Sequence, residues 1–252
     1  MQVVQAVLGY PAGGAGPAQA RQRVASLGQD PGLVDRVPSI VGTAASSAVE
    51  VIDAQYGGIL ADSASVLVAC RQWLAAADGQ VSQTGTTIDV RLVRASPRWT
   101  VTELRPADPG PVVAQLSAAA TAVLSSPRIV LPPAGVADVR SGQVHDSVLA
   151  AMLALARTYS IGVSVVRSGH PIQVFGTARL SDHPRGRAFD TWQVDGHAVV
   201  DAATPQSLVT AYMRAAASAG SYNVGGPYPL GGGATFFSDD THHDHVHAGF
   251  TT

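Results

Sequence analysis

The sequence predicts an α+β protein built from two domains. The chain has 252 residues, which is enough for two domains of ordinary size. Its first half carries four Val- and Thr-rich segments with the alternation of strands, while its second half mixes Ala-rich helical segments with short strands. Hydrophobic residues make up 46% of the chain and charged residues 13%, a composition that favours packed cores over disorder.

We expect an accessory domain at residues 1–110, with a short helix at 18–27 followed by a β-meander. Ile88, Val90 and Leu92 alternate with polar residues, which predicts a sheet with one face toward solvent. The texture of a helix followed by a meander resembles the cystatin-like fold of nuclear transport factor relatives, and it leaves the role of this domain open. The four predicted strands lie at residues 49–56, 65–74, 87–94 and 99–105.

The second domain is expected at residues 111–252, after a linker in the Pro- and Gly-rich segment 106–111. A hairpin is predicted around Asp195-Gly196, because this dipeptide favours a tight turn. The glycine-rich segment 225–233 is predicted as a loop beside the functional site. Helices are expected at 112–124, 146–157 and from an N-cap at Thr204 to Gly220, and strands at 162–167, 188–194, 197–201 and 246–250.

Composition excludes several classes of function. All 16 basic residues are Arg, so chemistry that needs a lysine Schiff base or a P-loop lysine is ruled out. The net charge of -2 disfavours binding to nucleic acid. A single cysteine, Cys70, rules out a disulfide framework and a thiolate-rich zinc site, and its apolar strand context indicates simple packing. No apolar run approaches the length of a membrane span.

The chemistry-bearing residues gather in the second half. All 8 His residues lie from His145 onward, whereas both Glu residues lie in the first half. His183 and Asp190 are separated by six residues with Gly186 between them. A loop that enters a strand can bring both side chains to one zinc ion, and the glycine allows a sharp turn or a close backbone approach.

A catalytic zinc needs a third protein ligand, which must come from another segment. His245 and His247 share one face of the last predicted strand, so either is available. A base must also accept a proton from the water that zinc activates, and without Glu in this half that base must be an Asp. Asp244 is the first candidate, with Asp239 and Asp240 as alternatives.

These residues match a family pattern. The segment Ser181-Asp182-His183-Pro184-Arg185-Gly186-Arg187-Ala188-Phe189-Asp190, together with the late segment Asp244-His245-Val246-His247, resembles the D-Ala-D-Ala metallopeptidase group. That group belongs to the set named after lysostaphin, the D-Ala-D-Ala metallopeptidases and sonic hedgehog. The resemblance covers about residues 112–252, and it implies an antiparallel sheet with flanking helices.

The resemblance also implies roles for individual residues. His183, Asp190 and His247 would bind Zn²⁺, and Asp244 would be the general base. Ser181 and His245 would support the substrate or the ligands by hydrogen bonding. The implied substrates are peptidoglycan stem peptides, cleaved by a carboxypeptidase or endopeptidase, and this substrate implies an extracytoplasmic location.

One position departs from the pattern. Ser168-Gly169-His170 looks like the family's Ser-Gly-aromatic segment, but Pro171 follows where many members have an arginine that steadies the tetrahedral intermediate. Arg179 or Arg167 is the expected substitute. The missing arginine motivates an alternative in which the zinc domain only binds cell-wall peptide or a protein partner, and a weaker one in which the His cluster buffers metal. His242 and His243 are expected to be solvated loop residues.

Overall fold

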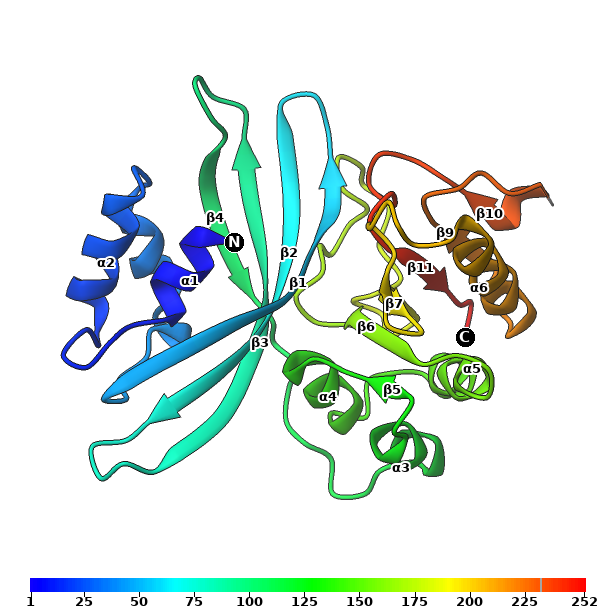
Figure 1. Ribbon diagram of the computed structural model, residues 1–252, viewed down its shortest axis with the longest axis horizontal. Helices are drawn as coiled ribbons and strands as arrows, with labels where there is room; N and C mark the ends of the chain where they lie inside the picture. Colours follow the sequence, from blue (N-terminus) through cyan, green and yellow to red (C-terminus); the bar gives the residue numbers. More distant parts are fainter. Residues whose placement is uncertain (232) are drawn as a thin grey trace. The chain divides into compact units, whose positions relative to one another are not determined.

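The chain folds as two units with separate hydrophobic cores. The structure, a computed structural model, describes residues 1–231 and 233–252, so Gly232 in the glycine-rich segment lies outside the described residues. The units span Met1–Ala107 and Asp108–Thr252, and the division falls within the segment predicted as a linker. Each unit combines a β-sheet with helices, which makes the protein mixed α+β (Figure 1).

A four-stranded antiparallel meander forms the sheet of the N-terminal unit, in the order β1-β2-β3-β4. All four predicted strands are confirmed. The first three are longer than expected, because pairing continues into polar segments near the turns that the alternation of apolar residues does not mark, whereas the fourth has the expected length and lies one residue later. The strands are β1 (Ser46–Ile59), β2 (Ser63–Ala75), β3 (Val81–Val93) and β4 (Thr100–Pro106).

Helices cover one face of this sheet (Figure 1). The expected helix is α2 (Pro17–Ser26), and a further helix, α1 (Gln2–Leu8), was not predicted. A helix of seven residues is too short to be stable alone, so α1 depends on packing its buried Val and Leu side chains against the core. Two 3₁₀ turns, η1 (Pro31–Arg36) and η2 (Pro38–Ile40), complete this layer.

The C-terminal unit contains four helices in its described residues; two helix starts differ from prediction, and one helix was not predicted. The first begins six residues later than expected, because the Ser117 side chain caps it by accepting from the Ala120 N–H. A helix that starts at Pro133 was missed. Thr204 does not cap the last helix; its hydroxyl donates instead to the Ala198 carbonyl. The helices are α3 (Ala118–Ser125), α4 (Pro133–Arg140), α5 (Asp146–Ala156) and α6 (Gln206–Ser218).

The sheet of this unit has the order β10-β9-β11-β7-β6-β5, with β8 paired to β7. Its central pairs are antiparallel, and the β9–β10 and β5–β6 pairs are parallel. The predicted hairpin is confirmed, with its turn at Asp195-Gly196. The strands are β5 (Ile129–Val130), β6 (Ile161–Val165), β7 (Ala188–Val194), β8 (His197–Ala198), β9 (Asn223–Gly225), β10 (Phe236–Phe237) and β11 (Val246–Gly249), and the short turn η3 (Gly233–Thr235) precedes β10.

Alternation along β7 and β11 separates the core from a polar face. Phe189, Val246 and Ala248 belong to the hydrophobic core with α5 and α6. Successive side chains in a strand point to opposite faces, so Asp190 and His247 lie on the other side of the sheet. That other face is where the polar residues predicted from the sequence gather.

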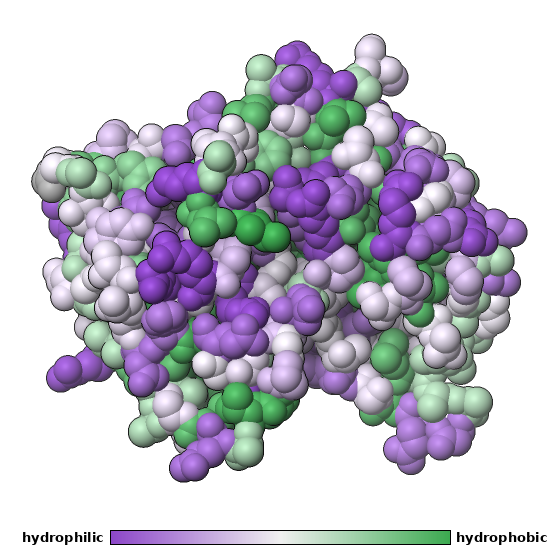
Figure 2. Space-filling model, turned by 180° about the vertical axis from the view of Figure 1, so that it is seen from behind, coloured by the Kyte–Doolittle hydropathy of each residue, from purple (hydrophilic) through white to green (hydrophobic). Residues whose placement is uncertain are grey.

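On the face in Figure 2, hydrophobic residues are interspersed with hydrophilic ones. Exposed large hydrophobic side chains occur in both units, among them Val81, Val112 and Ile172. Within the described residues, none of the helices combines the length and the apolar character required to cross a membrane.

Candidate metal centre

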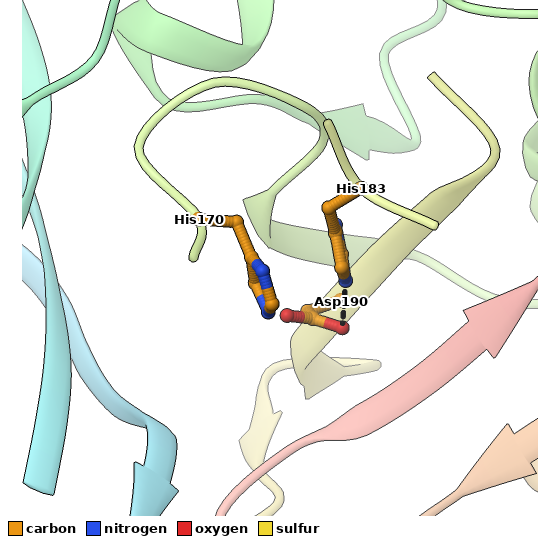
Figure 3. A group of neighbouring side chains, drawn as sticks. All are labelled: His170, His183 and Asp190. Carbon is orange, nitrogen blue, oxygen red and sulfur yellow. Dashed lines mark hydrogen bonds and ion pairs between the residues drawn. The ribbon is translucent and has the colours of Figure 1, made fainter. Parts of the chain in front are cut away.

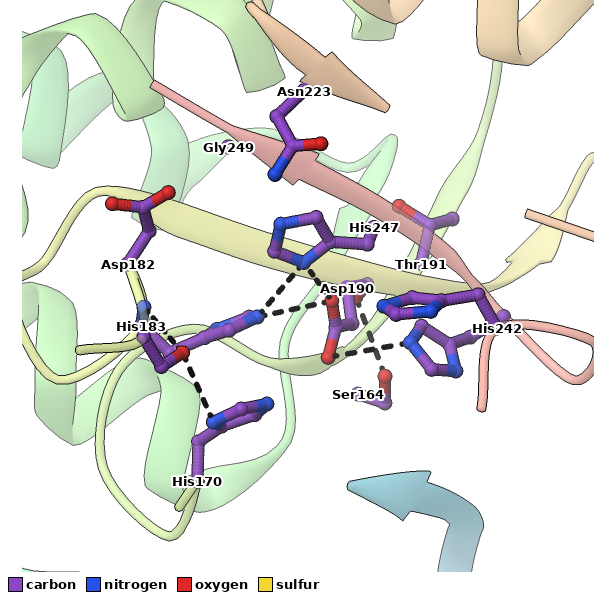
Figure 4. A network of polar contacts seen from close by, with 12 residues as sticks. Ser164, His170, Asp182, His183, Asp190, Thr191, Asn223, His242, His247 and Gly249 are labelled. Atoms are coloured by element: carbon purple, nitrogen blue, oxygen red, sulfur yellow. Dashed lines mark hydrogen bonds and ion pairs between the residues drawn. The ribbon is translucent and has the colours of Figure 1, made fainter. Parts of the chain in front are cut away.

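Three potential metal ligands meet on the polar face of the C-terminal sheet. His183 Nε2 lies 3.1 Å from Asp190 Oδ1 and 3.1 Å from His247 Nδ1, and the last two atoms are 3.0 Å apart (Figure 4). All three side chains are buried. A tetrahedral zinc with ordinary bond lengths keeps its ligand atoms roughly 3.3–3.5 Å apart. The observed triangle therefore has nearly the dimensions of one face of such a site.

Strand pairing explains why two of these ligands converge. Asp190 on β7 and His247 on β11 are direct partners in the antiparallel ladder. Side chains at such opposite positions have Cβ atoms about 4.5–5.5 Å apart on the same face. On the other side of β7, Ser164 of β6 donates a hydrogen bond to the Asp190 carbonyl oxygen. The sheet thus fixes two ligands before any loop contributes.

The third ligand, His183, comes from a tight turn that depends on Gly186. The Gly186 N–H donates to the His183 carbonyl at 2.8 Å, and Gly186 has a φ of +69°. A Cβ at this position would collide with the carbonyl oxygen of Gln143, while the His145 N–H donates to the Gly186 carbonyl. Both reasons for a glycine here, the sharp turn and the close backbone approach, are confirmed.

Hydrogen bonding fixes which nitrogen His183 offers. Its Nδ1 lies 2.8 Å from the Val166 carbonyl oxygen, and a carbonyl can only accept, so Nδ1 carries the proton in the neutral ring. Nε2 is then the nitrogen that faces Asp190 and His247. Burial lowers the pKa of His247 to about 4, so this ring is neutral as well and can place at most one N–H in the triangle.

Asp190 supplies the charge. Burial raises its pKa, but the charges of His183 and His245 and hydrogen bonds from His183 and His247 outweigh that effect, and the pKa is held well below its usual 3.8. The carboxylate is therefore ionised in a buried space lined by imidazole nitrogens. Such an arrangement favours a cation at its centre. Two nitrogen ligands and one oxygen ligand suit zinc.

His170 joins this cluster, although the sequence did not single it out as a ligand. Ligand atoms of His170, His183 and Asp190 all lie within 4.8 Å of one another, close enough to hold a metal ion (Figure 3). The ring of His170 stacks on that of His183 with a centroid distance of 4.1 Å. Burial lowers the pKa of His170 well below 6.5. The segment Ser168-Gly169-His170 resembles a family motif, but its pattern does not predict that the His170 imidazole lies beside the metal ligands.

The expected base and the residue after it form a buried pair. Asp244 Oδ1 lies 2.7 Å from His245 Nδ1, and His245 Nε2 lies 3.8 Å from Asp190 Oδ2. His245 thus presents one nitrogen to Asp244 and the other to a proposed ligand. His247 lies in β11 and His245 directly precedes it. Both side chains approach Asp190, as expected for two residues that share one face of a strand.

His242 lies in this cluster and is not the solvated loop residue expected. Its side chain is only 19% exposed, and its ring centroid is 5.1 Å from that of His245 and 5.7 Å from that of His247. Asp239 Oδ1 lies 2.6 Å from His242 Nδ1. Burial raises the pKa of Asp239, but the hydrogen bond and charge of His242 lower it overall to about 2. The signal in the sequence was an Asp and a His three residues apart, with that His only five residues before the predicted ligand His247.

The remaining predicted residues have mixed placements. Ser181 is buried, and its hydroxyl lies 3.4 Å from both His170 Nδ1 and the His183 backbone nitrogen. The N–H groups of Arg167 and Ser168 both donate to the buried Asp138 carboxylate at 2.9 Å, which anchors the start of the loop that carries His170.

Neither candidate arginine has a hydrogen bond or ion pair with the three ligands among the described residues. The Arg167 side chain binds Gln143 and the Asp108 carbonyl and lies 3.7 Å from Asp138. Arg179 is exposed, and its backbone N–H donates to the Thr177 hydroxyl. Arg167 is therefore engaged in holding loops together, and replacement of the missing arginine stays a prediction.

Comparison with protein-family models, with curated proteins and with solved structures found no match for this chain. The interpretation of the centre therefore rests on its own residues and geometry.

Proposed function

We propose that the C-terminal unit is a zinc-dependent peptidase that hydrolyses peptidoglycan stem peptides, as a D,D-carboxypeptidase or an endopeptidase. The convergence of His183, Asp190 and His247 within 3.1 Å carries this proposal. The resemblance of their segments to the D-Ala-D-Ala metallopeptidase group supplies the substrate class. On the same basis we assign this unit a hedgehog/D-Ala-D-Ala-peptidase-like architecture and the protein an extracytoplasmic location.

The chain's own residues divide the work around the metal. Zinc at this centre would lower the pKa of water and polarise a peptide carbonyl. Asp244 and His245 are joined at 2.7 Å, so we assign proton transfer to the pair, with Asp244 as the base and His245 oriented by it. His245 and Asp190 are both nearly inaccessible to solvent. Their burial limits competition from bulk water for the hydrogen bonds and charges of the centre.

Digestion of purified peptidoglycan, followed by mass spectrometry, tests this function. The zinc-loaded protein should release D-Ala or cleave within the stem peptide, and a chelator should abolish the reaction. Added zinc should restore it. A zinc-loaded protein that leaves every muropeptide mass unchanged would contradict the peptidase assignment.

Asp244→Asn separates metal binding from catalysis. The variant should keep its zinc and lose about 10²–10⁴-fold in kcat, as expected on removal of a general base. Asp240→Asn is the matched control, since Asp240 is an exposed loop carboxylate nearby, and it should retain activity. A fully active Asp244→Asn variant would show that the proton acceptor is another group.

A binding module is the second candidate. Pro171 stands where the family's arginine is expected, and Arg167 is committed to other partners, so stabilisation of a tetrahedral intermediate lacks its usual donor. In this case the protein would co-sediment with peptidoglycan in a zinc-dependent manner and leave the stem peptides intact.

For the N-terminal unit the proposal is limited to architecture. Its helices on one face of a four-stranded meander are compatible with a cystatin-like accessory domain. Spacing, docking to a wall or membrane partner, and dimerisation are the candidate roles.

A further inference from the structure

His170 approaches the candidate metal centre from the loop between β6 and β7, and its role follows from which of its nitrogens carries a proton. Nδ1 lies 3.0 Å from the Pro171 carbonyl oxygen. Because a carbonyl oxygen only accepts, Nδ1–H is the donor, and in the neutral ring Nε2 is left with a lone pair. Figure 3 shows the ring nitrogen farther from the backbone turned toward the Asp190 carboxylate.

That lone pair is poorly placed to bind the metal together with His183. The two rings are stacked at 4.1 Å with only 16° between their planes, and an imidazole lone pair lies in the plane of its ring. Two nearly parallel planes at this separation do not bring their lone pairs to one point. The ligand atoms of His183, Asp190 and His247 already lie 3.0–3.1 Å apart, close to the roughly 3.3–3.5 Å expected for co-ligands of a tetrahedral zinc, without a contribution from His170.

The place of the ring, stacked on one ligand and turned toward another, does suit a hydrogen bond to a group that is itself bound to the metal. His183, Asp190 and His247 already supply three ligands, and catalytic zinc keeps its fourth position for water or substrate. If a hydrogen-bond donor occupied that position, the lone pair on His170 Nε2 would be the acceptor offered to it from this loop.

We propose that His170 Nε2 accepts a hydrogen bond from the N–H or O–H group that occupies the fourth coordination position, and so selects ligands that carry such a donor. The inference rests on the proposed function, since it takes the three-ligand metal centre as given. It assigns His170 a role opposite to that of the arginine missing at position 171: an acceptor for the incoming group rather than a donor to an oxyanion. Pro171 contributes through its carbonyl, which fixes the ring.

Cobalt-substituted protein offers a test that does not need turnover. Co²⁺ replaces zinc and reports ligand binding through its visible absorption. Acetohydroxamate, whose metal-bound anion keeps an N–H donor, and azide, which carries none, are titrated separately. His170→Ala should weaken acetohydroxamate binding about three- to tenfold, the effect of losing one hydrogen bond, and should leave azide binding unchanged.

His170→Gln gives a second variant, because its amide oxygen can still accept. It should bind acetohydroxamate within about threefold of the unchanged protein. His197→Ala, in an exposed hairpin, is the control and should bind both probes normally. In the His170 variants the cobalt spectrum without added ligand should stay the same, because the number of metal ligands does not change.

Three results would overturn the inference. A changed cobalt spectrum or lost cobalt in both His170 variants would make His170 a ligand. Equal weakening of acetohydroxamate and azide would make its effect unspecific, and unchanged acetohydroxamate binding in His170→Ala would remove the hydrogen bond altogether. If the protein without any amino-acid substitution bound no cobalt, the proposed function would be overturned, and this inference with it.

Discussion

Both units bury aspartates, and Asp89 and Asp190 among them have partners of different kinds. Asp89 in the N-terminal sheet is 2% exposed, accepts from the Ser65 hydroxyl at 2.6 Å and pairs with Arg91 at 2.7 Å. Asp190 in the C-terminal sheet is 1% exposed and faces the nitrogens of His183 and His247. Asp89 has a hydroxyl and a guanidinium as donors, whereas the partners of Asp190 named here are imidazole rings.

The difference shows how a buried carboxylate can be assigned to structure or to a site. A carboxylate with a permanent cation and a hydroxyl donor is satisfied within the fold. A carboxylate whose partners are imidazoles has no permanent cation such as a guanidinium among them, and a metal ion provides a permanent positive charge. Substitutions in the two clusters should therefore have effects of different kinds.

The largest expected effect is loss of zinc from Asp190→Asn. An amide cannot supply the negative charge of the ligand set, so the variant should retain little or no zinc by elemental analysis of dialysed protein, against about one zinc per chain before substitution. Thermal unfolding of the metal-free forms provides the control, since the fold without metal should tolerate Asn. Zinc retained at full stoichiometry would mean that Asp190 is only a structural acid like Asp89.

Gly186→Ala should have the largest effect on folding. The new Cβ would collide with the Gln143 carbonyl, and the alanine backbone would have to keep a φ of +69°. We therefore expect a loss of about 3–4 kcal/mol in the free energy of unfolding. Gly196→Ala is a matched control with φ +82° and nothing within 4 Å, and it should cost only about 1 kcal/mol. Equal costs in urea denaturation would show that the close approach to Gln143 is not tight.

Acid should destabilise the metal-free protein through the C-terminal cluster. Burial lowers the pKa of His247 to about 4, so between about pH 6.5 and pH 4 the unfolded chain takes up a proton that the folded chain refuses. Stability should fall over this range as pH decreases, by up to about 3 kcal/mol from His247, with His170 acting in the same direction.

Asp89 should contribute a pH dependence of the opposite sign. Burial raises its pKa, and the hydrogen bond from Ser65 and the charges of Arg91 and Arg105 offset this only in part. Its contribution to stability is thus present below the usual pKa of 3.8 and is lost as pH rises through the raised value. NMR titration of metal-free protein distinguishes the two groups; a His247 that protonates near pH 6.5 would contradict the cluster described.

The smallest expected effect belongs to Asp89→Asn. The Asn side chain can still accept from Ser65 but loses the ion pair with a partly exposed Arg91, so we expect a loss of about 1–2 kcal/mol. Zinc content should stay at its original level. A change in zinc stoichiometry in this variant would break the separation between the two aspartates.

Periodic patterns made much of this arrangement predictable. The four meander strands follow from alternating Val, Thr and Leu, and the ligand pair follows from a motif that ends in one strand and a His-x-His in another. Helices α1 and α4 were missed because they are short and are stabilised by packing that local sequence does not encode. His170 and His242 were missed because loops place them, and loop geometry depends on contacts such as Arg167 and Ser168 with Asp138.

Anomalous diffraction at the zinc edge, from crystals of the zinc-loaded protein, tests the central claim most directly. The account predicts one strong peak within about 2.0–2.2 Å of His183 Nε2, an Asp190 carboxylate oxygen and His247 Nδ1, with a non-protein ligand in the fourth position. A peak elsewhere, or none in fully loaded protein, would contradict it.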